Sequence, residues 1–450
     1  MFRIIMPVYN AQDYLAEAIE SIMNQTLSFK ENVIIHLIDD ASTDNSLAVC
    51  NEYAGKYPDN IIVTHFEENR GVSGTRNYGI KQCRKEKDVI VGFVDSDDRL
   101  ESQALGKVKQ FFEKHRDVNL AAMEITHFGA REDEHKSNWR FEEKEVVDIT
   151  EDFNYPQFYI GGVFLKGRAL KRIHFDESMS FWEDALAINQ VILREGKYGL
   201  VRGAIYYYRK MENESSLVDK AWKNKERYTA FLENGYGRLM RYCKLRKFKV
   251  IPYIQFVVAY HLRLYLLESN RDAVMEMISE EEMPEFKRQL GEVLKNISDS
   301  VIVSMNTALP IIEAELSLKY GKKIRAKKTL TDNDMIFSYG DHEIGRLSER
   351  SVRVIGILDK PGYEGMLRGR FSTPLYAMKK DDYIFAQNNG QRIESVRYKC
   401  RKKVFVLDEL MRNYKNAGFA IAIPEDWEKV KFGIHIDGVD IMLKETAMPE

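Results

Sequence analysis

The sequence is poor in cysteine, and it carries no excess of either charge. Its four cysteines lie far apart and form no C-x-x-C pair, so we expect neither a disulfide framework nor a zinc site, and a reducing compartment fits. The 67 basic and 69 acidic residues give a net charge of -2, which excludes the global positive field typical of nucleic-acid-binding proteins.

Long uninterrupted hydrophobic segments are also missing. The most apolar stretch, residues 250–267, contains a proline, a histidine and an arginine. A transmembrane helix needs about 20 mostly uncharged residues, so this stretch predicts a packed helix. The N-terminal segment reaches Pro7 without a long apolar run, so we expect no signal peptide.

Length and composition predict a globular protein with more than one domain. The chain has 450 residues, of which 44% are hydrophobic and 30% charged. In its first part, apolar segments alternate with helical patterns. This alternation predicts βαβ units and a mostly parallel sheet covered by helices, with strands at 2–9, 33–38, 61–66 and 89–94.

A polar cluster follows each of these four predicted strands. Ligands of such sheets bind at the carboxyl ends of the strands, so we expect the clusters to meet at one edge. The clusters are PVYN at 7–10, DDASTD at 39–44, ENRGVSGTRN at 68–77 and DSDD at 95–98.

The DSDD cluster is the most informative of the four. In extended chain, residues two apart share a face, which places Asp95 and Asp97 about 6 to 7 Å apart and turns Ser96 away. Carboxylates held that close raise one another's pKa or need a cation, and such hard oxygen ligands suit Mg²⁺ or Mn²⁺. The alternative is a solvated turn in which Asp97 or Asp98 caps a helix that begins near Glu101.

The glycine-containing loop at 69–77 is a second, weaker element. Its glycines permit close backbone approach, and a helix that begins near Ser73 would direct free N–H groups at a phosphate or a bound nucleotide. It does not follow the first strand, so it is not a dinucleotide-binding fingerprint.

In order and spacing, IMPVYN, IDDASTDNS, NRGVSGTRN and FVDSDD resemble the motifs of the family 2 inverting glycosyltransferases, which have the GT-A fold and use nucleotide-diphosphate sugars. The resemblance covers roughly residues 1–215. It implies that Asp97 binds a divalent metal, Mn²⁺ or Mg²⁺, and that Asp98 supports the site or caps a helix. The donor-binding residues would be Pro7, Tyr9 and Asp40 at the base, Asn69 and Arg76 at the nucleoside, and Asp95 at the ribose with its neighbour Ser96.

The segment FWEDALAINQVIL contains the expected general base. Ser180 and Glu183 have the S-x-x-E spacing of a capping box, so Glu183 has a structural explanation. Asp184 points about 100° away around the helix. Family members carry an ED pair here whose aspartate is the base, so the resemblance assigns this role to Asp184. The alternative is that both acids only interact with the helix dipole.

The segment YYYRKMENESSL resembles a loop that closes over the diphosphate in wall-teichoic-acid glycosyltransferases. Arg209, Ser215 and Ser216 match that loop in kind, although it is shorter here and lacks the histidine often found there. The alternative is that Arg209 is an exposed charge at the end of a strand.

Two further segments follow residue 220. Residues 221–325 have helical apolar spacing, and their basic cluster at 238–249 is either a solvated face or a contact with an anionic membrane. From 326 onward, short strand-like runs with NNG and DG turns predict an antiparallel β-sandwich-like domain. This domain would bind acceptor polymer, form homo-oligomers or cover the helices. The predicted domains are 1–220, 221–325 and 326–450.

The alternation of strands and helices predicts an α/β protein, and the resemblance implies an enzyme that moves one hexosyl or N-acetylhexosaminyl unit, with UDP as the first choice of nucleotide because it dominates the resembled group. The acceptor would be a hydroxyl of a lipid-linked oligosaccharide, a teichoic-acid-like polymer or a capsule repeat. We expect a cytoplasmic location, with the inner face of the membrane as an alternative.

Three rival functions fit the sequence less well. A nucleotidyltransferase would need a glycine-rich loop after the first strand, where IMPVYNA stands. An inactive carbohydrate- or nucleotide-binding protein would not need Asp95, Asp97 and Asp184 together. A processive synthase would usually add transmembrane helices and a Q-x-x-R-W element.

Overall fold

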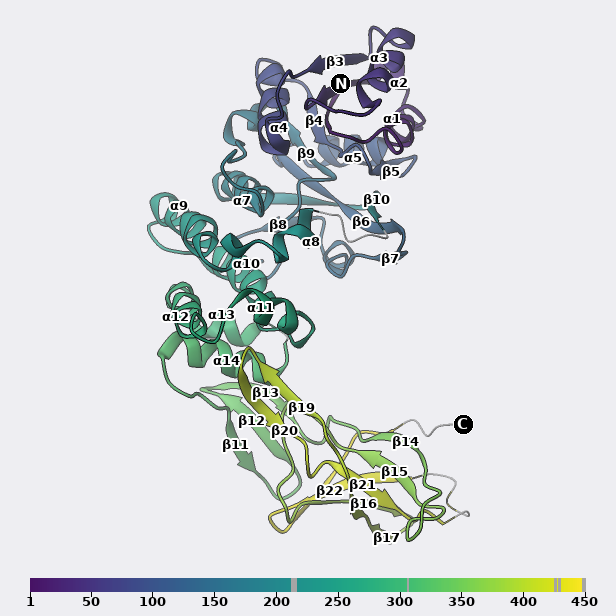
Figure 1. The fold of residues 1–450 in the computed structure, drawn as a ribbon, viewed down its shortest axis with the longest axis vertical. Helices are drawn as coiled ribbons and strands as arrows, with labels where there is room; N and C mark the ends of the chain where they lie inside the picture. Colours follow the sequence, from purple (N-terminus) through teal and green to yellow (C-terminus); the bar gives the residue numbers. More distant parts are fainter. Residues whose placement is uncertain (212–216, 306, 425–426, 428–429, 447–450) are drawn as a thin grey trace. The chain divides into compact units, whose positions relative to one another are not determined.

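The computed structural model describes residues 1–211, 217–305, 307–424, 427 and 430–446. Contacts within the chain divide it into two compact units, residues 1–258 and 259–450, each of which is shown in Figure 1. The helical segment expected at 221–325 therefore contributes to both units. The functional division at residues 220 and 325 stays a prediction.

Strands and helices alternate in the N-terminal unit, and each of the four strands expected from the apolar segments is present. The strands are β1 (Phe2–Val8), β2 (Val33–Asp39), β3 (Ile61–His65), β4 (Ile90–Phe93), β5 (Arg99–Leu100), β6 (Leu120–Gly129), β7 (Asp133–Glu134), β8 (Val146–Asp148), β9 (Val163–Lys166) and β10 (Lys197–Lys210). The α-helices are α1 (Leu15–Met23), α2 (Phe29–Asn32), α3 (Ser46–Lys56), α4 (Gly71–Cys83), α5 (Ala104–Lys114), α6 (Trp139–Glu143), α7 (Glu183–Glu195), α8 (Leu217–Trp222), α9 (Arg238–Lys247) and α10 (Pro252–Leu262), which runs past residue 258.

These strands form one sheet with a parallel half and a mixed half. Among the described residues its order is β3-β2-β1-β4-β9-β6-β10-β5, with β7 beside β6 and β8 beside β10. Strands β3, β2, β1 and β4 are parallel. Strand β9 then runs antiparallel between β4 and β6, and β6 pairs in parallel with β10. The carboxyl ends of the first four strands therefore meet at one edge, as predicted.

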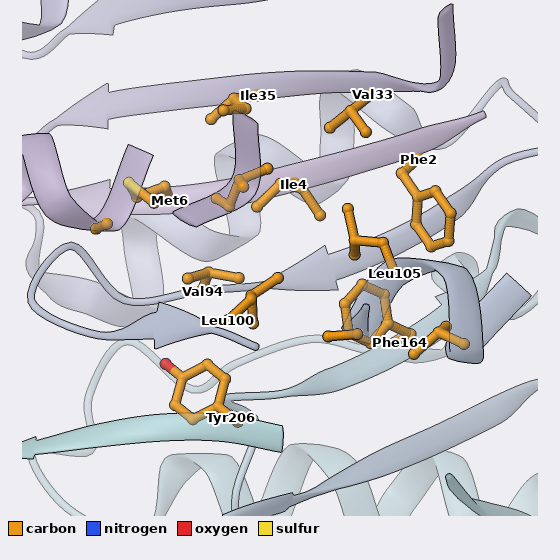
Figure 2. Packing of buried hydrophobic residues seen from close by; sticks show 14 of the residues in the cluster. Phe2, Ile4, Met6, Val33, Ile35, Val94, Leu100, Leu105, Phe164 and Tyr206 are labelled. Atoms are coloured by element: carbon orange, nitrogen blue, oxygen red, sulfur yellow. The ribbon is translucent and has the colours of Figure 1, made fainter. Parts of the chain in front are cut away.

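The core of this unit lies against β1, which is buried on both faces. Phe2, Ile4 and Met6 alternate along the strand and lie on one face, and none is more than 1% exposed. Figure 2 shows them with Val33 and Ile35 of β2 and with Leu105 and Phe164. The ring centroids of Phe2 and Phe164 are 5.9 Å apart in an edge-to-face arrangement. Burial on both faces explains why this segment, apart from Arg3, is apolar instead of alternating.

The C-terminal unit contains helices followed by antiparallel sheets. Its α-helices are α11 (Arg271–Met277), α12 (Met283–Leu294), α13 (Asp299–Ser304) and α14 (Leu309–Tyr320). Its strands are β11 (Lys327–Leu330), β12 (Met335–Tyr339), β13 (His342–Arg346), β14 (Arg353–Ile357), β15 (Leu367–Arg370), β16 (Tyr383–Asn388), β17 (Gln391–Glu394), β18 (Val396–Tyr398), β19 (Lys403–Val406), β20 (Glu409–Asn413), β21 (Gly418–Ile421), β22 (Lys431–Ile436) and β23 (Val439–Met442).

The pairings of these strands confirm the antiparallel prediction. In the described part of the unit the sheets are β11-β12-β13, β14-β15-β21-β18, β17-β16-β22-β23 and β19-β20. The two hairpin signals also hold. Asn389 and Gly390 join β16 to β17 with φ of 45° and 84°, and Asp437 and Gly438 join β22 to β23 with φ of 48° and 87°.

The apolar stretch at 250–267 does not form a long helix. Helix α10 has 11 residues and is followed by a short 3₁₀ turn at Arg263–Tyr265. Across the part of the chain that the structure describes, no helix has the length and apolarity needed to cross a bilayer.

Gly92 makes room for one of the largest side chains of the core. It lies opposite Phe164 in the β4–β9 pair, and a Cβ at position 92 would come within 2.3 Å of the Phe164 ring. We expect Gly92→Ala to lower the free energy of unfolding by about 1–3 kcal/mol, because the ring has to move within a packed core. Urea denaturation measures this change.

Gly55→Ala is the matched control. Gly55 lies in α3, and a Cβ there would have nothing within 4 Å. The same substitution at this position should be neutral or stabilise by up to about 1 kcal/mol, because alanine favours the helix. Equal effects of the two substitutions would contradict the packing described for Phe164.

Candidate active site

Two loops at the carboxyl ends of β1 and β2 are joined by side-chain hydrogen bonds. Oδ1 of Asn10 accepts a hydrogen bond from the backbone N–H of Thr43 at 2.8 Å. Oγ of Ser42 accepts one from the N–H of Asn10 at 3.0 Å. Asn10 has a left-handed φ of 48°, which turns the chain sharply after the strand. Pro7 lies at the end of β1, and Tyr9 beyond it is 52% exposed.

The two aspartates at the end of β2 have different partners. Asp39 is fully buried, and its Oδ2 lies 2.8 Å from Nδ1 of His65. Asp40 accepts a hydrogen bond from the backbone N–H of Arg70 at 2.7 Å. The backbone carbonyl of Asp40 accepts another from Nδ2 of Asn69 at 3.1 Å. Asp40 and Asn69, for which the family resemblance implies contacts with the base and the nucleoside, are therefore direct neighbours.

Arg76 of α4 is buried among three carboxylates. Its Nη1 donates to Oδ1 of Asp184 at 2.7 Å, and its Nη2 donates to Oδ1 of Asp95 at 2.9 Å. Oε1 of Glu183 lies 3.7 Å from Nη1. Only 4% of the Arg76 side chain is exposed, so these charges are weakly screened by water. We call these four residues the Arg76 cluster; it joins three predicted site residues, Arg76, Asp95 and Asp184.

Asp184 combines burial with access to solvent. It lies in the first turn of α7, and 26% of its side chain is exposed. Burial raises the pKa of the Asp184 carboxyl well above its usual value, the positive charge of Arg76 opposes this shift, and Glu183 and Asp95 add to it. A carboxylate with a raised pKa is a better proton acceptor near neutral pH.

The capping box predicted from Ser180 and Glu183 is wrong. Helix α7 begins at Glu183 itself, after Trp182 in a left-handed conformation with φ of 65°, and no side chain caps it. The helix therefore starts too late for Ser180 to be its N-cap. Glu183 instead contributes its charge to the Arg76 cluster.

Asp98 is a buried part of the DSDD turn and caps no helix. It is 2% exposed, and Oη of Tyr206 donates to its Oδ2 at 2.7 Å while the backbone N–H of Arg209 donates to its Oδ1 at 2.8 Å. Burial raises the pKa of Asp98 well above its usual value, and the charges of Asp97 and Asp95 raise it further. The helix expected near residue 101 begins at Ala104.

Asp97 differs from its neighbours because its carboxylate has no hydrogen bond or ion pair with any other described residue; its own backbone N–H is its hydrogen-bond partner. Burial and the charge of Asp95 raise the pKa of Asp97 to about 6. Ser96 is buried, as expected if it turns away from the two aspartates. Among the described residues, no three histidine, cysteine, aspartate or glutamate side chains form a metal-binding group. Asp97 thus suits a metal ion only when water and substrate phosphate oxygens supply the other ligands.

Arg209 is not an exposed charge at the end of a strand. Its Nε donates to the backbone carbonyl of Asp97 at 2.8 Å, and its guanidinium pairs with Glu17. The same group lies 4.7 Å from the ring centroid of Tyr14 and 4.3 Å from that of Phe128. Arg209 therefore supports the turn that carries Asp97. Ser215 and Ser216 lie outside the described residues.

Tyr206 is a site residue that the sequence patterns did not single out. Its hydroxyl accepts a hydrogen bond from the backbone N–H of Asp95 at 3.1 Å and donates to Asp98. Its ring fills the space beside two consecutive glycines. A Cβ at Gly161 would lie 3.0 Å from the ring, and one at Gly162 would lie 2.9 Å from Cβ of Tyr206. The glycine pair in the sequence was the available signal for a side chain packed this closely.

The fold and the site define the class of this protein. A parallel half-sheet with an acidic turn after its last strand, continued by a mixed half-sheet, is the GT-A glycosyltransferase fold. The crystal structure of S. aureus TarS matches with a TM-score of 0.60 over 98% of this chain and 77% of that chain, at 17% identity. Residues 1–349 of TarS in complex with UDP-GlcNAc match with a TM-score of 0.54 over 76% of this chain and 97% of that chain, at 20% identity.

Sequence comparisons identify the family. A model described as glycosyl transferase family 2 matches residues 3–177. The minor teichoic acid biosynthesis protein GgaA of Bacillus subtilis is 34% identical over 94% of this chain and 92% of its own length. GgaB of the same organism is 31% identical over 94% of this chain but only 46% of its own length. The chain belongs to glycosyltransferase family 2 and is a glycosyltransferase.

The Tyr206 hydroxyl is expected to stabilise the DSDD turn. Tyr206→Phe leaves the buried Asp98 carboxylate with one partner fewer and the Asp95 N–H without its acceptor. We expect a loss of about 1–3 kcal/mol in the free energy of unfolding, measured by urea denaturation. Tyr207→Phe is the control, because no hydrogen bond of its hydroxyl is found among the described residues. A loss of similar size in both variants would argue against the bridge.

Proposed function

We propose that this enzyme transfers a single sugar from a UDP-sugar to a hydroxyl of a teichoic-acid-type polymer, with inversion at the anomeric carbon and with a divalent metal ion. The names of GgaA and GgaB support the polymer class. The UDP-GlcNAc complex of TarS, whose fold this chain shares, supports UDP as the nucleotide. The transferred sugar would be a hexose or an N-acetylhexosamine.

The donor would bind along the edge formed by the carboxyl ends of β1, β2 and β4. The exposed ring of Tyr9 and the adjacent Asp40–Asn69 pair suit a nucleobase and its nucleoside. The remaining donor residues of this proposal are Pro7 at the base, Asp95 and Ser96 near the ribose, and Arg209, Ser215 and Ser216 toward the diphosphate.

Asp97 is the proposed metal ligand. Its carboxylate has no hydrogen-bond or ion-pair partner among the other described residues, and the neighbouring Asp95 adds negative charge. One protein carboxylate combined with two phosphate oxygens is a common arrangement for Mg²⁺ and Mn²⁺. When bound, the ion supplies charge that stabilises the leaving nucleoside diphosphate.

Asp184 is the proposed general base. It would accept the proton of the acceptor hydroxyl while that oxygen attacks the anomeric carbon from the side opposite the diphosphate, so that a single displacement inverts the configuration. The raised pKa of Asp184 suits this role. Because its side chain is partly exposed, the acceptor hydroxyl can reach it.

The observation that carries this proposal is the double hydrogen bond of Arg76. One guanidinium holds Asp95, on the donor side, and Asp184, the proposed base, at 2.9 and 2.7 Å. In this proposal the planar geometry of the arginine fork would hold the base in place relative to the donor. We assign Arg76 this positioning role in place of the nucleoside contact expected from the sequence.

The reaction would take place in the cytoplasm, at the inner face of the membrane if the basic cluster at 238–249 contacts lipid. Self-association through the C-terminal sheets remains part of the proposal and is tested by the molar mass of the protein in solution.

Thermal-shift screening tests the donor. We expect the melting temperature to rise with a UDP-sugar, and to rise further when Mn²⁺ or Mg²⁺ is added, because a ligand that binds only the folded state stabilises it. At a free ligand concentration of 100 times its dissociation constant, the folded state is stabilised by about 2.7 kcal/mol. Nucleoside diphosphates without sugar and sugars without nucleotide serve as controls. No metal-dependent stabilisation by any nucleotide sugar would favour a carbohydrate-binding protein without donor chemistry.

Asp184→Asn tests the base. We expect transfer to fall by at least about 10²-fold, the usual contribution of general-base catalysis, while the dissociation constant of the UDP-sugar changes little. In the wild-type enzyme, kcat/KM should fall on the acidic side at a pH above the ordinary titration range of aspartate, because the base must be deprotonated and its pKa is raised.

Asn189→Asp makes the reverse substitution on the same helix and is the control for a change of charge away from the Arg76 cluster. Asn189 lies on the same helix and is fully buried, and its Nδ2 donates to backbone carbonyls of Gln157 and Ala185. This variant should lose stability with no selective effect on the pH profile. Normal turnover of the Asp184→Asn variant would contradict the assignment of Asp184 as the general base.

A further inference from the structure

A groove in the C-terminal unit is lined by a concentration of positive charge. It has a volume of 520 Å³ and lies between α12, α14 and the turn that joins β19 to β20. Two acidic side chains, Glu292 and Glu409, also line it. Its basic side chains are Lys287, Arg288, Lys295, Lys319, Lys322 and Lys323. The whole chain carries a net charge of -2, so this surface departs from the average composition of the protein.

The groove is held in a fixed shape by close helix packing and by the end of α14. A Cβ at Gly291 would lie 2.6 Å from the carbonyl oxygen of Leu318, so α12 and α14 approach each other as closely as glycine permits. Gly321 ends α14 in a left-handed conformation, and the N–H of Lys322 donates to the carbonyl of Ser317 at 3.2 Å. Lys322 and Lys323 therefore extend from an ordered helix end.

Three of the six basic side chains already pair with a carboxylate outside the set named above: Lys287 with Asp408, Arg288 with Glu285 and Lys319 with Asp299. The other three, Lys295, Lys322 and Lys323, keep much of their capacity to bind an anion. Lys322 has no ion pair with any described residue, and Lys323, 67% exposed, lies 4.0 Å from Glu409. Lys295 pairs with Glu292 at 2.7 Å, but both side chains are more than half exposed. Exposed pairs of this kind contribute little, so a phosphate can compete for the lysine.

One aromatic ring and an apolar floor complete the groove. Tyr320 is 48% exposed, and its hydroxyl donates to Asp299 at 2.8 Å, which orients the ring. Leu318, Val406 and Leu407 contribute apolar surface. A partly exposed tyrosine offers an apolar face and a polar edge, which suits the C–H surface of a sugar or polyol.

We propose that this groove binds a phosphodiester-linked polyol or sugar polymer, as a second contact for the acceptor chain in addition to the residues that transfer the sugar. Cations spaced along a hollow with an apolar floor match a chain in which phosphates alternate with polyol units. A concave surface fits a single chain better than a flat lipid layer. Binding of single-stranded nucleic acid would call for several stacking aromatic rings, and the groove lining contains one.

The identity of the polymer as the acceptor rests on the function proposed above, whereas the affinity of the groove for a phosphodiester chain does not. A second contact holds a long acceptor near the active site between transfers. It therefore lowers the KM for long polymers and leaves kcat unchanged.

The test uses the full chain with Lys295, Lys322 and Lys323 replaced by glutamine. A matched control carries Lys360→Gln, Lys380→Gln and Lys431→Gln, which change the charge equally at exposed positions of the same unit outside the groove. The probes are fluorescent poly(ribitol phosphate) of about 30 repeats, a one-repeat ribitol phosphate, phosphatidylglycerol vesicles and a single-stranded oligonucleotide. Binding of each probe is measured over a range of salt concentrations.

We expect the groove variant to bind the long polymer at least about fivefold more weakly than the control, with a salt dependence lower by about two charges. The KM for the long polymer should rise by a similar factor, with kcat and the one-repeat acceptor unaffected. Equal binding by the two triple variants would overturn the proposal. Preferential loss of binding to vesicles or to the oligonucleotide would also overturn it, because a different macromolecule would then occupy the groove. If no sugar transfer is found at all, the function proposed above fails. The binding measurements then still show whether the groove binds the polymer.

Discussion

The ion-pair cluster around Arg76 is the interaction on which the arrangement of this site depends. Asp95, Glu183 and Asp184 come from segments separated by about 90 residues of sequence, and their charges would repel one another without a cation between them. A guanidinium that is 4% exposed offsets that repulsion and fixes the direction of two of the carboxylates. Removal of this one charge would leave three acids close together in a partly buried place, which is far more costly than the loss of an exposed ion pair.

The parts of the fold that follow local sequence patterns were predictable. Four apolar segments gave four parallel strands, and the rule for their carboxyl ends gave the edge at which Asp40, Asn69 and Asp95 lie. The hairpins at Asn389–Gly390 and Asp437–Gly438 followed from residue types that accept positive φ. These features depend on nearest neighbours along the chain, which is why one sequence sufficed.

Features that depend on contacts between distant residues were not predictable. Strand β9 lies antiparallel between β4 and β6, and the short apolar sequence of β9 does not predict which strands it pairs with. The S-x-x-E spacing at Ser180 predicted a cap, but Glu183 has a partner on α4 and the helix begins later. From the sequence, the separate roles of the three aspartates of the DSDD turn could be predicted only in outline. The contacts of Tyr206 and Arg209, more than 100 positions away, make Asp98 the buried support of the turn, while neither residue bonds the carboxylate of Asp97.

The packing of Tyr206 against Gly161 and Gly162 has a consequence for how this enzyme can diverge. A side chain at either glycine would come too close to Tyr206, and a smaller residue at 206 would leave a cavity and remove one of the two hydrogen bonds to the buried Asp98. The residues at these three positions therefore depend on one another, because a substitution at any one of them alone would lower the stability of the fold. Homologues that differ at one of them are expected to differ at the others as well, while Tyr9, whose side chain is exposed, is under no such packing constraint.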